Sequence, residues 1–185
     1  MGRKKNIKLW NHLMKELDDF EIKAGWFENT RYDADTPVAG IAAVQNYGVE
    51  INQKVTPKQR AFLHYAGIHL KETTENLHIV IPPRPFMDNA KKRIQGSEGK
   101  QIILQELLRV FEGRQTMEQA TNRLGLWEQG IIQEEIKKIQ TPPLSANTIS
   151  MRNKQYKSQS KNSSTKPLNS SGIMFNTVQY EVTKK

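Results

Sequence analysis

The stretch Ile81-Pro82-Pro83-Arg84-Pro85-Phe86-Met87 decides how the middle of this chain folds. Each of its three prolines lacks an amide donor and biases the preceding residue toward extended geometry, so neither a helix nor a central strand can run through it. Residues 77–81 have the period of two that is typical of a strand, and a helical pattern begins at Phe86. The prolines therefore predict a rigid strand-to-helix corner that holds Arg84 and Phe86 in set directions.

Regular patterns also lie upstream of this corner. Residues 7–20 place apolar side chains at steps of three and four and predict an amphipathic helix, and residues 21–28 have the period of a strand. Pro37 suits the first turn of a short helix over residues 37–47, with Asp35 or Thr36 as its cap and Gly48 at its end.

Two helices are predicted after the corner, over residues 85–94 and 102–111, with a break at 96–99 that Ser97 would cap. Thr116 and Gln119 then form a capping-box signature for a long apolar-striped helix that Pro142 and Pro143 terminate. Its Glu134-Glu135 and Lys137-Lys138 pairs are typical of a solvated helix face. A last strand over residues 177–182 needs a partner, either 21–28 or 77–81.

Two segments interrupt this plan. Residues 49–76 predict a projecting excursion, one form of which is a hairpin, with a helix from Thr56-Pro57 that Gly67 stops. After a short capped turn at 144–149, residues from about 150 to 166 combine few apolar side chains with many charges, so we expect a flexible basic segment that meets phosphates, an acidic protein or solvent alone. The fold prediction is α+β: one domain over residues 1–185, with a small, twisted, mainly antiparallel sheet packed against helices.

Composition excludes several classes of protein. The chain has 185 residues and no cysteine, which rules out disulfides and thiolate chemistry. No secretory signal or membrane-spanning run is evident. The net charge is +9, and residues 150–185 supply most of it, with seven basic residues against Glu181 alone.

Catalytic patterns are weak, so we expect neither an enzyme nor a bound cofactor. His64 and His69 are five residues apart, which does not place them on one helical face, and no third ligand stands nearby, so no metal site is predicted. Asp33 and Asp35 lack the other oxygen ligands of a calcium loop and suit a turn or a helix cap.

Several motifs, taken in order, carry a family resemblance. They are Ala24-Gly25-Trp26-Phe27, the helix that ends Asn46-Tyr47-Gly48, the corner itself, Pro142-Pro143-Leu144-Ser145 with Thr148-Ile149 and Arg152, and Lys166-Pro167-Leu168 with Ser171-Gly172 and Val178-Gln179-Tyr180. This succession resembles the minor structural proteins of tailed bacteriophages. More narrowly, it is similar to the tail-completion or head–tail joining proteins of the neck.

The resemblance implies a virion protein, made in the bacterial host cytoplasm, that forms a ring, expected to be a hexamer, between the portal-side connector and the tail tube or tail terminator. It also implies transient, non-specific contact with genomic DNA and no membrane partner. The expected structural or interface residues are Tyr47, Gly48, Pro82, Pro83, Arg84, Pro85 and Phe86. The basic residues expected to face DNA or a partner are Lys91, Lys92, Arg93, Arg152, Lys154, Lys157 and Lys161.

One further hypothesis is that Arg84 pairs with a carboxylate of a neighbouring subunit through its two-pronged donor geometry. The plain alternative makes Phe86 a core residue and Arg84 a surface residue. Other functions stay open: a tail terminator or another minor tail protein, a nucleic-acid-binding regulator that uses residues 116–140 and the basic tail, or a hydrolase accessory to the particle.

Overall fold

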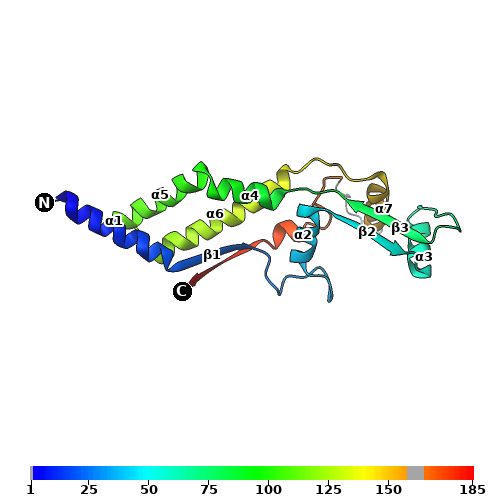
Figure 1. Ribbon diagram of the computed structural model, residues 1–185, viewed down its shortest axis with the longest axis horizontal. Helices are drawn as coiled ribbons and strands as arrows, with labels where there is room; N and C mark the ends of the chain where they lie inside the picture. The colour runs from blue at the N-terminus through cyan, green and yellow to red at the C-terminus, as the bar shows by residue number, and fades with distance from the viewer. Residues whose placement is uncertain (1, 158–164) are drawn as a thin grey trace. The chain divides into compact units, whose positions relative to one another are not determined.

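A computed structural model describes residues 2–157 and 165–185 and shows an α+β fold, as predicted. Within those residues the chain forms eight helices and four strands, and the strands pair as two separate antiparallel two-stranded sheets (Figure 1). The fold divides into two compact units. The first comprises residues 1–30, 86–135 and 177–185, and the second comprises residues 31–85 and 136–176. The prediction of a single domain stays a prediction.

The first unit is a group of helices beside a small sheet (Figure 1). Its elements are α1 (Gly2–Asp18), β1 (Phe20–Gly25), α4 (Phe86–Gln95), α5 (Ser97–Phe111), α6 (Met117–Lys138) and β4 (Gln179–Lys184), although the last three residues of α6 belong to the second unit. The terminal strand β4 pairs with β1 in antiparallel register, from Phe20 opposite Lys184 to Gly25 opposite Gln179. This settles which of the two predicted partners the last strand takes.

The core of this unit forms where α1 meets α5. Leu13, Leu107 and Met117 are buried together, and the rings of Trp10 and Phe111 meet edge to face with centroids 6.2 Å apart. The apolar stripes predicted from the helical periods therefore face one another. In α6, Gly125 lies so close to Tyr180 of β4 that an added Cβ would clash with the ring. The absence of a side chain at Gly125 therefore lets the helix pack closely on the sheet.

The second unit combines short helices with a hairpin-like sheet (Figure 1). Its elements are α2 (Val38–Tyr47), β2 (Val49–Lys54), α3 (Pro57–Tyr65), β3 (Asn76–Ile81), α7 (Ala146–Lys157) and α8 (Ile173–Asn176). Strand β2 pairs with β3 from Val49 opposite Ile81 to Lys54 opposite Asn76. The excursion is thus an antiparallel pair whose strands are joined through α3, and β2 is a strand that the sequence pattern did not predict.

Helix α3 begins and ends as the sequence predicts. The Thr56 hydroxyl accepts a hydrogen bond from the Gln59 backbone, and the Gln59 side chain accepts one from the Thr56 backbone. At the other end, Gly67 has a φ of 85°, and the amide of Ile68 donates to the carbonyl of Leu63. This six-to-one bond is the Schellman closure of a helix, which favours glycine at the left-handed position.

Three local predictions need correction. Neither Asp35 nor Thr36 caps α2, because Pro37 occupies the N-cap position without a side-chain hydrogen bond, while Asp33 accepts hydrogen bonds from the amides of both residues. Ser97 is the first residue of α5, and Gly96 occupies its N-cap. The short turn expected at 144–149 is the start of the longer helix α7, so residues 150–157 are helical. The rest of the expected flexible segment falls partly on residues 158–164, outside the described residues.

Candidate interaction site at the proline corner

The proline corner forms where it was predicted, between the end of β3 at Ile81 and the start of α4 at Phe86. Phe86 is fully buried, and its ring packs edge to face against Trp26 with centroids 6.1 Å apart. It is therefore a core residue of the first unit. This agrees with the alternative that makes Phe86 a core residue, and an effect of Phe86 on assembly stays a prediction.

Gly48 brings the end of α2 against the corner. Its φ is 73°, and a Cβ built there would lie 2.7 Å from the Ile81 carbonyl oxygen and 2.8 Å from the Pro83 nitrogen. Only glycine allows that approach without displacing backbone. The neighbouring Tyr47 is 70% exposed. The two residues that end α2 therefore differ in role, since Gly48 packs inward and Tyr47 remains accessible.

Arg84 is buried, which contradicts both the surface alternative and the hypothesis of a salt bridge to a neighbouring subunit. Its side chain is committed to oxygen acceptors of the second unit. Nε donates to the Pro142 carbonyl at 3.1 Å, Nη2 to the Pro143 carbonyl at 3.3 Å, and Nη1 to Gln45 Oε1 at 3.0 Å. The planar guanidinium thus ties the corner to a second proline pair 58 residues further along the chain.

Pro142 and Pro143, which follow α6, therefore anchor the proline corner as well as ending the helix. Their carbonyls accept from Arg84, and the next residues lead into α7, whose N-cap Ser145 accepts a hydrogen bond from the amide of Thr148. Further along α7, Arg152 Nη1 donates to the carbonyl oxygens of Lys166 and Asn169. Burial lowers the pKa of Arg84, and the nearby charge of Arg152 lowers it further.

A large cavity lies beside this cluster within the second unit. Its volume is about 1010 Å³, and its walls come from β3, the end of α3, the start of α7 and residues 168–174. Arg84, Pro82 and Pro143 line it. The predicted corner therefore forms part of the wall of a cavity that the sequence pattern did not reveal.

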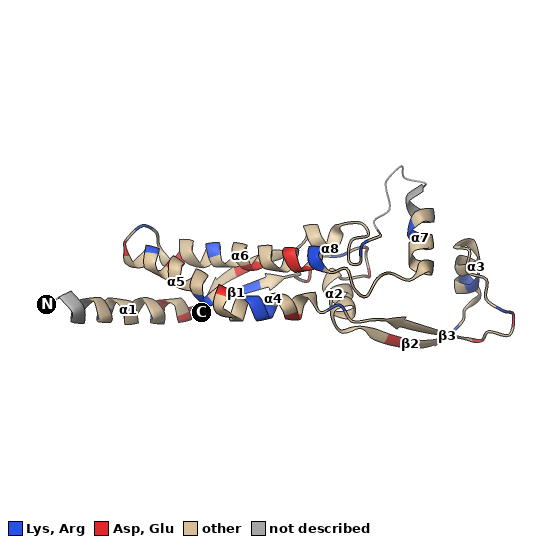
Figure 2. Cartoon of the chain, turned by 90° about the horizontal axis from the view of Figure 1, so that it is seen from above, with Lys and Arg blue, Asp and Glu red and all other residues tan. Residues whose placement is uncertain are grey.

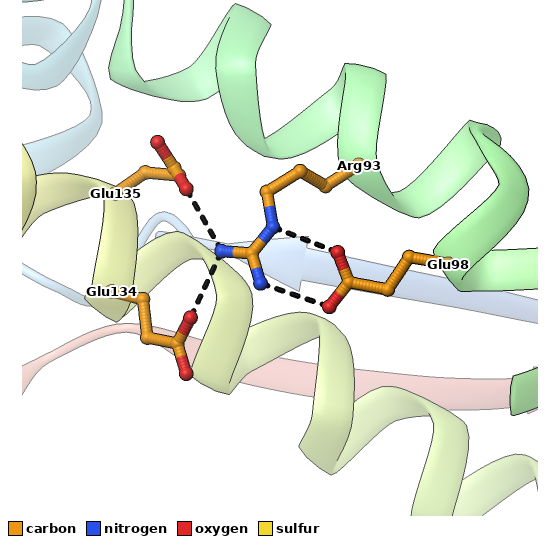
Figure 3. A network of polar contacts seen from close by, with 4 residues as sticks. All are labelled: Arg93, Glu98, Glu134 and Glu135. Atoms are coloured by element: carbon orange, nitrogen blue, oxygen red, sulfur yellow. Dashed lines mark hydrogen bonds and ion pairs between the residues drawn. The ribbon is translucent and has the colours of Figure 1, made fainter.

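The basic residues of α4 are divided between solvent and an internal network. Lys91 and Lys92 are exposed, whereas the Arg93 guanidinium lies among three carboxylates (Figure 3). Nε and Nη2 bond the two oxygens of Glu98, each at 2.9 Å, and Nη1 bonds Glu134 at 2.9 Å and Glu135 at 2.8 Å. Arg93 therefore has a structural role, because its guanidinium is bonded within the chain and is not directed toward DNA or a partner.

This network also corrects the interpretation of the end of α6. Glu135 is only 6% exposed, so Glu134-Glu135 is not a uniformly solvated pair. The three carboxylates raise the pKa of Arg93, mainly through its hydrogen bonds to Glu98 and Glu134. Charges of both signs are interspersed along α4 and α6 (Figure 2). The remaining basic candidates, the side chains of Lys154 and Lys157 and the whole of Lys161, lie outside the described part of the chain.

His64 and His69 are brought together although their spacing does not fit one helical face. The helix ends at Tyr65, and the turn through Gly67 places the two Nδ1 atoms 2.9 Å apart on exposed rings. Within the described residues no group of three or more His, Cys, Asp or Glu side chains forms a metal site. Nor is any helix in those residues long and apolar enough to cross a membrane.

Comparison with known proteins adds no identification, because no family model, curated protein sequence or solved structure matches the chain.

Proposed function

We propose that this chain is a structural protein of a tailed-phage neck, a ring-forming tail-completion or head–tail joining subunit that links the portal-side connector to the tail. The motif order gives the family resemblance. The structural observation that best supports assembly is the combination of strand edges without a second neighbour and large exposed apolar side chains.

The unpaired edges follow from the sheet topology. Each sheet has two strands, so within the described residues β1, β2, β3 and β4 each pair on one side only. An open strand edge is a template for pairing with another chain. A ring of identical subunits uses such surfaces without leaving a free end, because a head-to-tail interface closes on itself when its rotation permits.

Both units also expose large apolar side chains. On α3 of the second unit, Phe62 is 60% and Tyr65 is 78% exposed. On α5 of the first unit, Leu104 is 47% and Leu108 is 43% exposed, and they lie four residues apart on one helical face. Exposed apolar groups that cluster in this way are typical of surfaces that bind other proteins.

The oligomeric state of the chain and its presence in virions test this proposal directly. Light scattering and negative-stain imaging of the purified chain are expected to show a ring, and antibody labelling is expected to place the chain at the neck of purified virions. Phe62→Ser and Leu108→Gln are expected to weaken ring formation, whereas the matched changes Lys58→Ser on α3 and Gln105→Ala on α5 leave it intact. A chain that stays monomeric at all concentrations and is absent from virions would show that the proposal is wrong.

Weak DNA contact is part of the same proposal. A neck lumen lets the genome pass, so any binding is expected to be non-specific and to weaken steeply with salt. Lys91 and Lys92 are the exposed candidates on α4. Tight, sequence-selective binding in a gel assay would favour a nucleic-acid-binding regulator instead.

A further inference from the structure

The outer edge of β3 offers hydrogen-bonding groups that nothing in the described chain uses. The amide of Val55 donates to the carbonyl of Glu75 at 2.8 Å, which identifies these opposite residues as a hydrogen-bonded pair. Such pairs recur at every second residue of an antiparallel ladder. In the observed register, His78 and Val80 therefore point their N–H and C=O groups away from β2. No hydrogen bond from any described residue reaches these outer groups.

This edge borders the large cavity of the second unit. Six consecutive residues, from Leu77 to Pro82, line the cavity, whereas no residue of β2 does. Side chains of a strand alternate between its two faces, so a continuous run along a wall means that the strand presents its edge. Strand β3 has six residues, which at about 3.3 Å per residue gives an edge of roughly 20 Å.

The walls of the cavity set the chemistry of what fits there. Apolar side chains predominate, including Leu77 and Ile79 of β3 and Met151 of α7. The two arginines that line it are Arg84 and Arg152, and none of its lining residues is Asp or Glu. A segment with apolar side chains and a carboxylate complements both features.

We propose that the outer edge of β3 binds an extended segment of a partner protein by strand addition, with alternate apolar side chains in the cavity and a carboxylate toward the positive charge of Arg152. Strand addition draws affinity from main-chain hydrogen bonds and specificity from pockets for alternate side chains. The inference rests on the proposed function for the identity of the partner, which is a neighbouring protein of the virion.

A second copy of this chain fits less well. At the β3 edge a second copy would have to bring a whole two-stranded sheet with its packed helices up to the cavity. The open edges of β1, β2 and β4, none of which lines the cavity, remain for contacts between identical subunits. A cavity of about 1010 Å³ is of the size that takes one drug-sized ligand or one short segment. A single extended segment therefore suits it better.

The test uses the purified full chain and a panel of synthetic hexapeptides that alternate Val, Ile or Leu with Thr and end in Glu with a free carboxylate. Binding is followed by calorimetry and by hydrogen exchange of the His78 and Val80 amides. Two control peptides accompany each member: one is methylated on alternate amide nitrogens, which blocks strand pairing, and one ends in an amidated Gln, which removes the negative charge.

Matched variants separate the edge from a general surface effect. Val80→Pro removes an outer amide on β3, and Asn52→Pro removes the equivalent outward amide of β2, whose edge does not border the cavity. Circular dichroism checks that both variants fold. We expect Val80→Pro to weaken binding at least tenfold and Asn52→Pro to change it less than twofold. Arg152→Gln is expected to weaken the carboxylate peptides several-fold and to leave the amidated ones unchanged.

Three results would overturn the inference. One is failure of every peptide in the panel to bind up to about 1 mM, which is the limit of weak but specific recognition. The others are equal binding of the methylated peptides and an equal loss in Val80→Pro and Asn52→Pro. If the chain alone instead forms oligomers that Val80→Pro dissolves, the occupant is a second copy and the proposed partner is wrong. Peptide binding needs no virion, so its failure is distinct from absence of the chain from the neck.

Discussion

Arg84 is joined to Gln45 twice, once through the main chain and once through the side chains. The amide of Arg84 donates to the Gln45 carbonyl oxygen at 2.8 Å, and its Nη1 donates to Gln45 Oε1 at 3.0 Å. The last turns of α2 and the proline corner are therefore one polar joint, although 39 residues separate them in sequence. Removing either side chain is expected to disturb the same joint.

Arg84→Ala is expected to lower the free energy of unfolding by about 3 kcal/mol, because the carbonyls of Pro142 and Pro143 lose their buried donor. Arg84→Lys is expected to recover less than half of that loss, since an ammonium group cannot reproduce the planar fork. Urea unfolding measures both. Full recovery by lysine would mean that charge alone matters at this position.

Gly48→Ala is expected to cost about 3 kcal/mol, because it combines an unfavourable backbone conformation with a clash against the corner. Gly113→Ala is the matched control, since its φ is 71° but a Cβ there meets nothing within 4 Å. The control is expected to cost about 1 kcal/mol. Equal losses in thermal unfolding would show that the approach to Ile81 and Pro83 is not tight.

Arg93→Ala is expected to destabilise the chain by about 3 kcal/mol, because it removes the cation that three carboxylates share, one of which is buried. Glu134→Gln changes only the most exposed of those carboxylates and is expected to cost less than about 0.5 kcal/mol. Chemical unfolding of the two variants gives the comparison. A loss in Glu134→Gln as large as that in Arg93→Ala would contradict the central role of Arg93.

Two glycines of α6 are expected to respond oppositely to alanine. Gly125→Ala places a methyl group against the ring of Tyr180 and is expected to destabilise by about 2 kcal/mol through overpacking. Gly130→Ala meets nothing within 4 Å and is expected to stabilise by about 0.5–1 kcal/mol through helix propensity. Differential scanning calorimetry distinguishes the two, and stabilisation by both would argue against close packing of α6 on β4.

Glu128 predicts a dependence of stability on pH. Burial raises the pKa of this carboxyl from 4.5 to about 7. The folded state therefore holds the proton more tightly than the unfolded state, so the stability linked to this group is complete below about pH 4.5 and is lost as pH rises to 7. Since Glu128 is partly exposed, solvent screening reduces the effect to about 1–2 kcal/mol.

Glu128→Gln is expected to remove that slope, so the variant should exceed the parent in stability at pH 8 and converge with it at pH 4. Urea unfolding at the two pH values measures the difference. Parallel pH profiles for parent and variant would show that Glu128 titrates normally.

Sequence patterns predicted most of the elements because local signals determine them. Proline geometry marked the corner, Thr56-Pro57 marked the start of α3, the capping box of Thr116 and Gln119 marked α6, and the helical stripes marked the core of the first unit. Strand β2 was missed because its residues 49–54 bear mostly exposed, mixed side chains and lack a clear apolar alternation. Its pairing with β3 joins residues 49–54 to residues 76–81, and a pattern within either segment alone cannot show that the two meet.

The candidate site was predictable only in part. The strand-to-helix corner was predicted in the right place. Arg84, however, was assigned to an outside partner because its acceptors, the Pro142 and Pro143 carbonyls, are main-chain atoms that leave no sequence signal. The carboxylates of Glu134 and Glu135 were missed for another reason, since they lie up to 42 residues from Arg93 and no local sequence pattern shows that they meet it. The cavity, too, is a product of long-range packing.

The pairing of β1 with β4 joins residues 20–25 to residues 179–184. Ribosomes make β1 well before β4, so β1 waits with its edge open while the residues between the two strands are made, and closing so long a loop slows folding. A chain interrupted before residue 179 cannot complete this sheet. Completion of the first unit therefore reports that translation has passed β4, and before that point the unit has no finished surface to offer for assembly.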